Sequence, residues 1–163
     1  MEITTVIVDN FLDKPDLVRK SALELPFEAT GPYPGFRSDR AERDYEAYVQ
    51  EKIEKILNSK IKEFKQDSFR FQICTENVET WVHMDETNWA AILYLTPDAP
   101  YEAGTGIYAD TGHSYELVTG IGNVYNRLVI YKGTMLHKSI LPGFGDSKET
   151  GRLTQVFFFN TED

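Results

Sequence analysis

The sequence predicts an α+β fold, with N-terminal helices packed on one sheet of an antiparallel β-core of the jelly-roll type. Two observations support this. Helical patterns are confined to the first 67 residues, and short runs rich in Phe, Ile, Val, Tyr and Thr then alternate with turn-forming residues. The runs lie at 68–74, 78–84, 89–96, 104–110, 127–132, 135–140 and 152–159. With 163 residues, of which 41% are hydrophobic, we expect 1–163 to form one domain.

The elements of the N-terminal segment follow from local patterns. Residues 3–8 are rich in β-branched side chains and predict a strand. Pro15 then opens a run with apolar residues at helical spacing. Gly, Pro and Ser concentrate at 29–40, which predicts an exposed ordered loop. Apolar residues recurring from 45 to 57 predict an amphipathic helix that continues towards 61–64.

Composition argues against several classes of partner. The formal net charge is −9, from 26 acidic and 17 basic residues, so nucleic acid and anionic membranes are poor partners. The N-terminus has neither the basic flank nor the apolar stretch of a signal peptide, and no apolar segment is long enough for a membrane span.

Cys74 is the single cysteine, and we interpret it as a small buried hydrophobe. A reducing, cytoplasmic location is therefore expected.

Two histidines and one aspartate form a candidate metal site. His83 and Asp85 are two positions apart at the end of a strand-like run, so both side chains project to the same face. His137 lies in a later strand-like run and is a candidate third ligand. Two imidazoles and one carboxylate on one side of an ion form the facial triad of non-haem Fe(II) oxygenases. Taken alone, the His83 and Asp85 pair is better explained as a solvated turn next to a strand, and the later residues shift the balance towards a metal site.

Arg152 provides the second half of the site. It opens the last strand-like run, and Thr154 is two residues on, on the same face. A guanidinium inside a core otherwise lined by Phe and Val needs an anionic partner, because an unpaired buried charge costs several kcal/mol. A dicarboxylate ligand held by Arg152 and Thr154 would provide that partner.

These motifs resemble the catalytic core of the 2-oxoglutarate and Fe(II) dependent dioxygenases, in the style of the prolyl 4-hydroxylase-like branch. The resemblance covers 68–160 and is carried by WVHMDETNWAAILYLTP, YEAGTGIYAD, HKSI and GRLTQVFFF. It implies a double-stranded β-helix, a cupin-like jelly roll, as the catalytic core, with 1–67 supporting it. It also implies Fe(II) on the three ligands, O2 as co-reactant, and 2-oxoglutarate held by Arg152, Thr154 and the Tyr94 hydroxyl. The implied reaction is hydroxylation of an unactivated C–H bond.

Several residues and loops allow more than one interpretation. In this branch a tyrosine often binds the keto-acid end of 2-oxoglutarate. The corresponding position here lies near Cys74, so this hydrogen bond is missing or comes from Gln72. Arg37 is interpreted either as a contact for an anionic substrate or as half of an exposed salt bridge. The loops at 31–40 and 141–151 are candidate substrate lids. Trp81 and Trp89, which flank the metal motif, are core or pocket wall, and His113 is a surface residue.

Two other functional classes compete with the oxygenase. One is a cupin-like metal enzyme without 2-oxoglutarate, such as a Zn(II) isomerase or hydrolase. The other is a non-catalytic binding domain that uses 31–40 for a partner. For an oxygenase, the substrate is either a peptidyl or prolyl residue or a small metabolite, because a fold does not fix a substrate. The oligomeric state is also open.

Overall fold

The computed structural model describes residues 1–162, which form two antiparallel sheets and two helices. The eight-stranded sheet has the order β1-β9-β6-β11-β5-β3-β2, with β4 pairing on β11, and the three-stranded sheet has the order β10-β7-β8. The strands are β1 (Thr5–Val8), β2 (Ala29–Gly31), β3 (Tyr33–Arg40), β4 (Ile61–Phe64), β5 (Arg70–Cys74), β6 (Trp89–Tyr94), β7 (Thr105–Asp110), β8 (Tyr115–Ile121), β9 (Leu128–Lys132), β10 (His137–Ser139) and β11 (Arg152–Thr161). The helices are α1 (Pro15–Glu24) and α2 (Arg43–Leu57).

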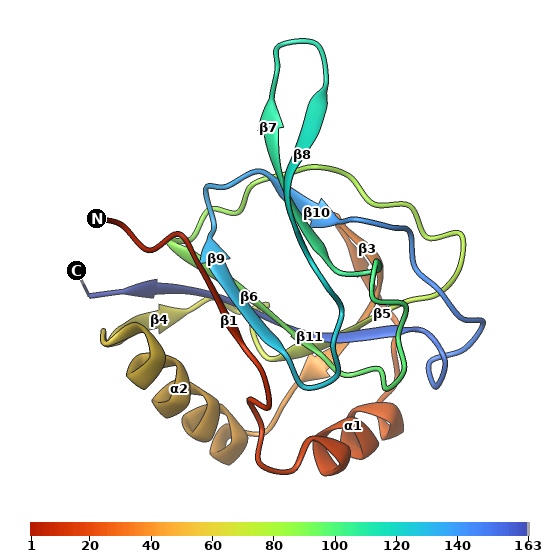
Figure 1. The fold of residues 1–163 in the computed structure, drawn as a ribbon. Coiled ribbons are helices and arrows are strands. Elements are labelled where there is room, and N and C mark those ends of the chain that lie inside the picture. Colours follow the sequence, from red (N-terminus) through yellow and green to blue (C-terminus); the bar gives the residue numbers. More distant parts are fainter. Residues whose placement is uncertain (163) are drawn as a thin grey trace.

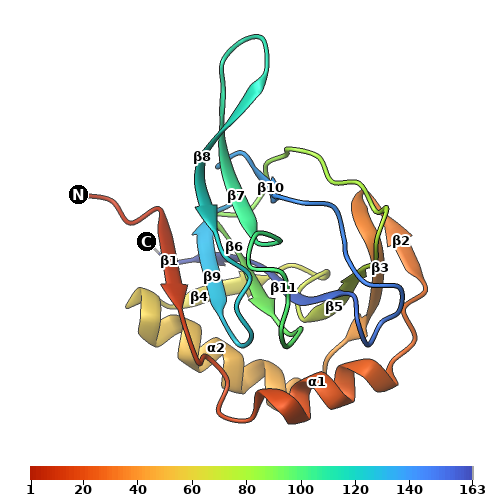
Figure 2. The ribbon, with the colours of Figure 1, turned by 45° about the vertical axis from the view of Figure 1, so that its right-hand side comes forward.

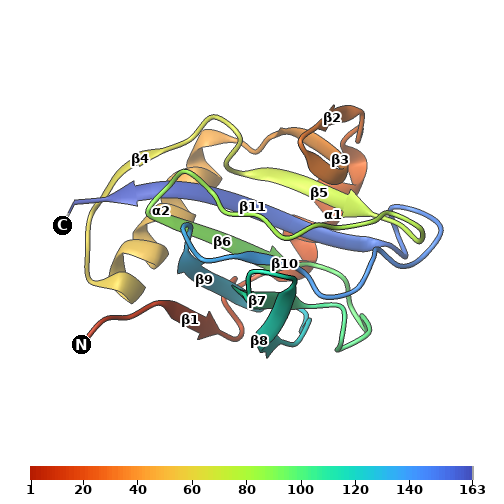
Figure 3. The same cartoon turned by 90° about the horizontal axis from the view of Figure 1, so that it is seen from above.

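The last strand, β11, organises the larger sheet. Figure 3 shows it between β5 and β6, and it pairs with both as well as with β4. Its side chains alternate between the two faces of the sheet. Phe157 and Phe159 pack in the core cluster that includes helix residues, whereas Phe158 packs in the other cluster. The run of three phenylalanines therefore packs on both faces of the sheet.

The two helices lie along one face of the eight-stranded sheet, opposite the β7-β8 hairpin (Figures 1 and 2). Ala22 of α1 and Val49 and Ile53 of α2 are fully buried in one cluster with residues of β5, β6, β9 and β11. Burial of such a cluster is the main stabilising term for a domain of this size.

The smaller sheet covers part of the opposite face. Ile107 and Ile121 pack against Tyr94, Val129 and Tyr131 of the larger sheet. A second core therefore lies between the two sheets, as in a jelly roll. The β7-β8 hairpin then extends away from the body of the molecule (Figure 2). Its tip is exposed and includes His113, as expected.

The expected exposed loop at 29–40 was wrong, because these residues form β2 and β3. β3 pairs with β5 and places Phe36 opposite Ile73 and Arg37 opposite Gln72. Gly35 makes the close approach possible: its φ is +72°, and a Cβ there would lie 2.1 Å from the Ile73 carbonyl oxygen. The pairing partner lies more than 30 residues away, so local Pro and Gly content gave no sign of it.

Three further boundaries differ from the sequence expectations. The second helix ends at Leu57, where Asn58 takes a left-handed conformation (φ 50°), and 61–64 form β4 instead of a last helical turn. The run at 78–84 is irregular apart from one bridge between His83 and His137. The missed strand β8 is exposed along most of its length, so it has no buried alternation to detect.

Within the described residues, helices are too short or too polar to cross a membrane.

Candidate metal centre and cosubstrate site

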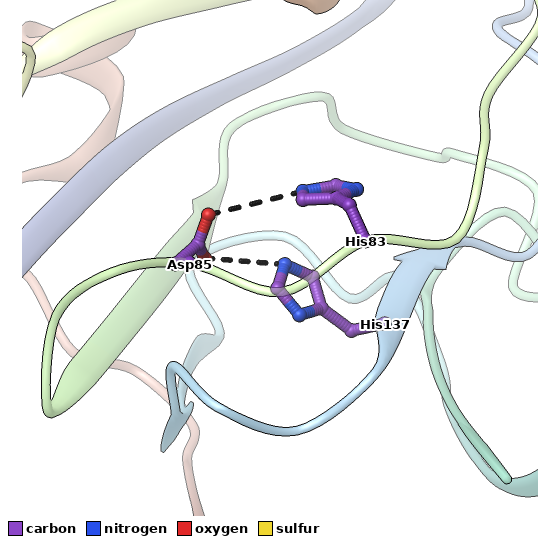
Figure 4. Close-up of side chains that lie close together, drawn as sticks. All are labelled: His83, Asp85 and His137. Atoms are coloured by element: carbon purple, nitrogen blue, oxygen red, sulfur yellow. Dashed lines mark ion pairs between the residues drawn. The ribbon is translucent and has the colours of Figure 1, made fainter. Parts of the chain in front are cut away.

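The backbone brings the three predicted metal ligands together. His83 and Asp85 lie in the irregular segment between β5 and β6, and His137 opens β10. His83 and His137 exchange two backbone hydrogen bonds, of 3.1 and 2.9 Å, and the Asp85 N–H donates to the Gly133 carbonyl at 2.7 Å. Residues more than 50 positions apart are thus fixed side by side (Figure 4).

The two imidazole rings are held in one orientation. His83 Nδ1 lies 2.9 Å from the Trp81 carbonyl oxygen, and His137 Nδ1 lies 2.8 Å from the Met135 carbonyl oxygen. A carbonyl only accepts hydrogen bonds, so the neutral rings carry their proton on Nδ1 and present an unprotonated Nε2. This is the usual way in which a protein prepares a histidine to ligate a metal.

The ligand atoms converge on one point. One potential ligand atom from each residue lies within 4.8 Å of the others. His83 Nε2 is 3.9 Å from Asp85 Oδ1, and His137 Nε2 is 3.2 Å from Asp85 Oδ2 (Figure 4). Asp85 Oδ2 is buried and has no hydrogen-bond partner among the described residues. Three lone-pair donors facing one another repel unless a cation lies between them, so the donor set fits a divalent metal ion.

One side of this centre is open. The His137 side chain is only 4% exposed and that of Asp85 16%, whereas the His83 side chain is 40% exposed. A hollow of about 700 Å³ adjoins His83 and Asp85 and is also lined by Arg37 and Trp81. A molecule of substrate size therefore has access to the ligands from this side.

The predicted cosubstrate anchors lie on neighbouring strands. Arg152 is buried, its Nε donates to the Ala103 carbonyl at 3.1 Å, and its Nη2 has no partner in the described chain. Thr154 is also buried and lies opposite Tyr94 in the β11-β6 pairing. The guanidinium carbon of Arg152 is 5.6 Å from the centre of the Tyr94 ring.

Tyr94 differs in one respect from what the resemblance implies. Its hydroxyl forms a 2.6 Å hydrogen bond with Thr105 Oγ1, so it is already engaged. Burial raises the pKa of Tyr94, although Arg152 opposes this effect. The phenol therefore stays neutral, and its hydroxyl has lone pairs and one proton to share between Thr105 and a ligand.

Tyr131 on β9 packs near both the candidate metal ligands and the predicted cosubstrate anchors, and no sequence pattern indicated this. Its ring lies 4.6 Å from that of His137, and it packs in the same cluster as Tyr94. Burial raises the pKa of Tyr131 well above its ordinary value, with a further contribution from the Asp85 carboxylate. In the sequence this residue is one of several apolar positions in a buried strand, so only the three-dimensional arrangement identifies it.

Gln72 and Arg37, whose roles the sequence left open, contact each other. Gln72 Nε2 donates to the Pro34 carbonyl at 2.8 Å, and its Oε1 accepts from Arg37 Nε at 2.9 Å, so Gln72 orients Arg37. Arg37 is only 7% exposed, and its Nη1 lies 3.9 Å from Asp67 Oδ2, so the salt bridge is present with a buried guanidinium and a carboxylate that is 59% exposed. Burial lowers the pKa of Arg37 despite the opposing charges of Asp67 and Asp85.

The flanking tryptophans occupy different environments. Trp81 is 46% exposed on the wall of the hollow, and Trp89 is 7% exposed in the core. Cys74 is buried, as expected, and burial raises the pKa of its thiol.

Comparisons with known proteins agree with the fold. The model of a family described as "Family of unknown function (DUF6445)" matches 2–119 and 109–159. No curated protein matches the chain. A Pseudomonas putida prolyl-4-hydroxylase is 16% identical, with a TM-score of 0.61, and 98% of this chain and 94% of that one are covered.

Two further solved structures hold ligands. HygX from Streptomyces hygroscopicus with nickel, 2-oxoglutarate and hygromycin B is 9% identical, with a TM-score of 0.69 and coverage of 96% and 82% of the two chains. A Trichoplax adhaerens prolyl hydroxylase in complex with a hypoxia inducible factor peptide is 11% identical, with a TM-score of 0.57 and coverage of 96% and 83%. At such identities the likeness shows the fold alone, which is the jelly roll of the 2-oxoglutarate and Fe(II) oxygenases.

Proposed function

The chain belongs to the DUF6445 family, whose function is unknown, and we propose that it is an Fe(II) and 2-oxoglutarate dependent dioxygenase that hydroxylates a C–H bond. The observation that carries the proposal is a pair of buried groups without partners. Among residues 1–162, four buried side-chain atoms have no hydrogen-bond partner, and two of them are Asp85 Oδ2 and Arg152 Nη2. A metal ion satisfies the first and a carboxylate the second. 2-Oxoglutarate is the ligand that connects them, because its keto acid chelates a metal and its far end carries a carboxylate.

Each residue has a defined part in this proposal. His83, Asp85 and His137 hold Fe(II), which with 2-oxoglutarate and O2 supplies the oxidising chemistry, yielding succinate and CO2. Arg152 binds the far carboxylate in a charged hydrogen bond, worth about 1.5–3 kcal/mol. Residues 68–160 then form the catalytic core and 1–67 its support, within a single domain.

Thr154, Tyr94 and Tyr131 shape the space between metal and anchor. Thr154 adds a hydroxyl on the Arg152 face of β11, and Tyr94 lies across from it. Tyr131 is buried beside His137 and keeps bulk water away from that ligand. A dry cavity strengthens the attraction between Arg152 and a carboxylate, because the local dielectric constant is low.

A thermal unfolding titration tests the proposal. Mn(II), a redox-inert substitute for Fe(II), should raise the melting temperature, and 2-oxoglutarate should raise it further only when the metal is present. At 100 times its Kd the ligand adds about 2.7 kcal/mol, or about 5–10 °C for a chain of this size. Arg152→Ala should abolish the second shift, and His113→Ala, at the exposed hairpin tip, should keep both.

The same titration separates the competing functions. A metal shift without a 2-oxoglutarate shift would indicate a cupin-like metal enzyme, in which the same ligands hold Zn(II) for other chemistry. The absence of any metal shift would indicate a non-catalytic binding domain. Either result would refute the oxygenase proposal.

A further inference from the structure

We propose that the hollow beside His83 and Asp85 binds its substrate through a carboxylate group held by Arg37. The inference rests on the proposed function only in calling that ligand the substrate of the oxygenase. It assigns Arg37 to substrate recognition, and it narrows the substrate class to carboxylic acids with an apolar or aromatic body.

Arg37 is held in a fixed position. Its Nε donates to Gln72 Oε1 at 2.9 Å, and the Gln72 amide is itself fixed by its bond to the Pro34 carbonyl. The guanidinium lies 3.7 Å from the centre of the Tyr33 ring. An arginine that stacks on an aromatic ring and is hydrogen-bonded at Nε has its two terminal nitrogens held in one orientation. It therefore loses little further conformational entropy on binding an anion.

Arg37 has opposing charges in Asp67 and Asp85, but only Asp67 lies within ion-pair distance among the described residues. Its side chain is 8% exposed, and its ion-pair partner is Asp67, 3.9 Å from Nη1. The Asp67 side chain is 59% exposed and also faces Arg70 Nε at 3.5 Å, so it is shared and solvated. A buried guanidinium with so distant a partner is costly unless a ligand supplies an anion. A carboxylate matches the planar fork of the two terminal nitrogens.

The position of Arg37 connects this charge to the metal centre. Arg37 lines the same hollow as His83 and Asp85, which present the metal-ligating atoms. A carboxylate on Arg37 would therefore place the rest of the molecule in the hollow beside the metal. The volume, about 700 Å³, suits a small molecule or a single side chain with its flanking groups.

The walls of the hollow indicate what else the ligand carries. Besides Tyr33, they include Trp81, Met84 and Phe158. Trp81 is 46% and Met84 59% exposed, so apolar surface faces solvent where a ligand would cover it. The whole chain carries a net charge of −9, so it repels anions over most of its surface. The buried guanidinium of Arg37 would therefore attract an anionic ligand to this place specifically.

Side-chain NMR can test this assignment without any turnover. Arg37 Nε and Arg152 Nε are both buried and hydrogen-bonded, so their protons exchange slowly and give observable N–H signals. We would record these signals in protein with diamagnetic Zn(II) in place of Fe(II), and assign Arg37 by the loss of its signal in Arg37→Lys. The probes are phenylacetate, its neutral analogue phenylacetamide, and 2-oxoglutarate.

Phenylacetate is expected to shift the Arg37 signal, and phenylacetamide to leave it in place. Arg37→Gln should weaken phenylacetate binding, followed on the Trp81 indole signal, by about tenfold or more, the effect of losing one charged hydrogen bond. Lys65→Gln is the matched control, because Lys65 is a cation on the same hollow whose Nζ is exposed and pairs with Glu63 at 2.9 Å. It should change binding by less than about threefold.

Three results would overturn the inference: an unmoved Arg37 signal, equal binding of acid and amide, or equal weakening by Lys65→Gln and Arg37→Gln. The measurement with 2-oxoglutarate distinguishes a failure of the oxygenase proposal from a failure of the Arg37 proposal. A shift of Arg152 alone supports both assignments, whereas a shift of Arg37 in place of Arg152 makes Arg37 the cosubstrate anchor and refutes its substrate role. If 2-oxoglutarate shifts neither but phenylacetate still shifts Arg37, the oxygenase function fails and the carboxylate site stands.

Discussion

Replacement of Arg152 by methionine should have little effect on the stability of the free protein while abolishing its stabilisation by 2-oxoglutarate. Two opposing free-energy contributions decide the stability of the ligand-free variant. The Ala103 carbonyl loses the hydrogen bond from Arg152 Nε, which costs about 1–3 kcal/mol if nothing replaces it. The replacement also removes a buried charge whose Nη2 has no partner, and such removal gains about 1–4 kcal/mol when the new side chain packs well. We therefore expect a net change below about 2 kcal/mol.

Urea unfolding with Mn(II) present, with and without 2-oxoglutarate, measures both parts of the Arg152 prediction. Wild type should gain about 2.7 kcal/mol at a ligand concentration of 100 times its Kd, and Arg152→Met should gain almost nothing. A loss of more than about 4 kcal/mol in the ligand-free variant would refute the reasoning. That size of loss is typical of breaking a buried pair, and it would show that Arg152 is already satisfied within the fold.

Three further predictions concern the metal centre, pH and the β3 strand. Asp85→Ala should abolish the Mn(II) shift in melting temperature without destabilising the metal-free protein, because Asp85 Oδ2 has no partner to lose; a retained shift would exclude Asp85 as a ligand. Glu54 accepts hydrogen bonds that lower its pKa from 4.5 to about 2, so it binds fewer protons in the folded state, and its contribution to stability should be lost as pH falls from about 4.5 towards 2. In urea unfolding at a series of pH values, the free energy of unfolding of Glu54→Gln should fall less with decreasing pH than that of Glu51→Gln. The same pH dependence in both variants would contradict this role of Glu54. Gly35→Ala should lower the free energy of unfolding by more than about 1 kcal/mol, since a Cβ would meet the Ile73 carbonyl at a positive φ; wild-type stability on urea unfolding would show that β3 is not held this close to β5.

The candidate metal cluster was partly predictable from the sequence, because the signal of its first two members is local. His83 and Asp85 are two positions apart, and the extended-chain period of two places both on one face. The third member of the cluster, His137, was predicted from its residue type and its place in a strand-like run. The structure adds the carbonyl partners at Nδ1, which lie two residues before each histidine and have no signature in the sequence.

The substrate side of the site was much harder to predict. Arg37 lies in a Pro- and Gly-rich stretch that predicts a loop, and its burial depends on pairing with β5, more than 30 residues away. Tyr131 is likewise one of several apolar residues in β9, and only its contact with His137 singles it out. Both residues are placed by non-local strand pairing, which local propensity and periodicity do not predict.

Anaerobic titration of the protein with Fe(II) and then 2-oxoglutarate tests the central claim most directly. If His83, Asp85 and His137 hold one metal ion with adjacent positions open, one equivalent of Fe(II) should bind. 2-Oxoglutarate should then produce the visible metal-to-ligand charge-transfer band of a chelated keto acid, in wild type and not in Asp85→Ala. Fe(II) binding without that band, or the same band in Asp85→Ala, would contradict the account.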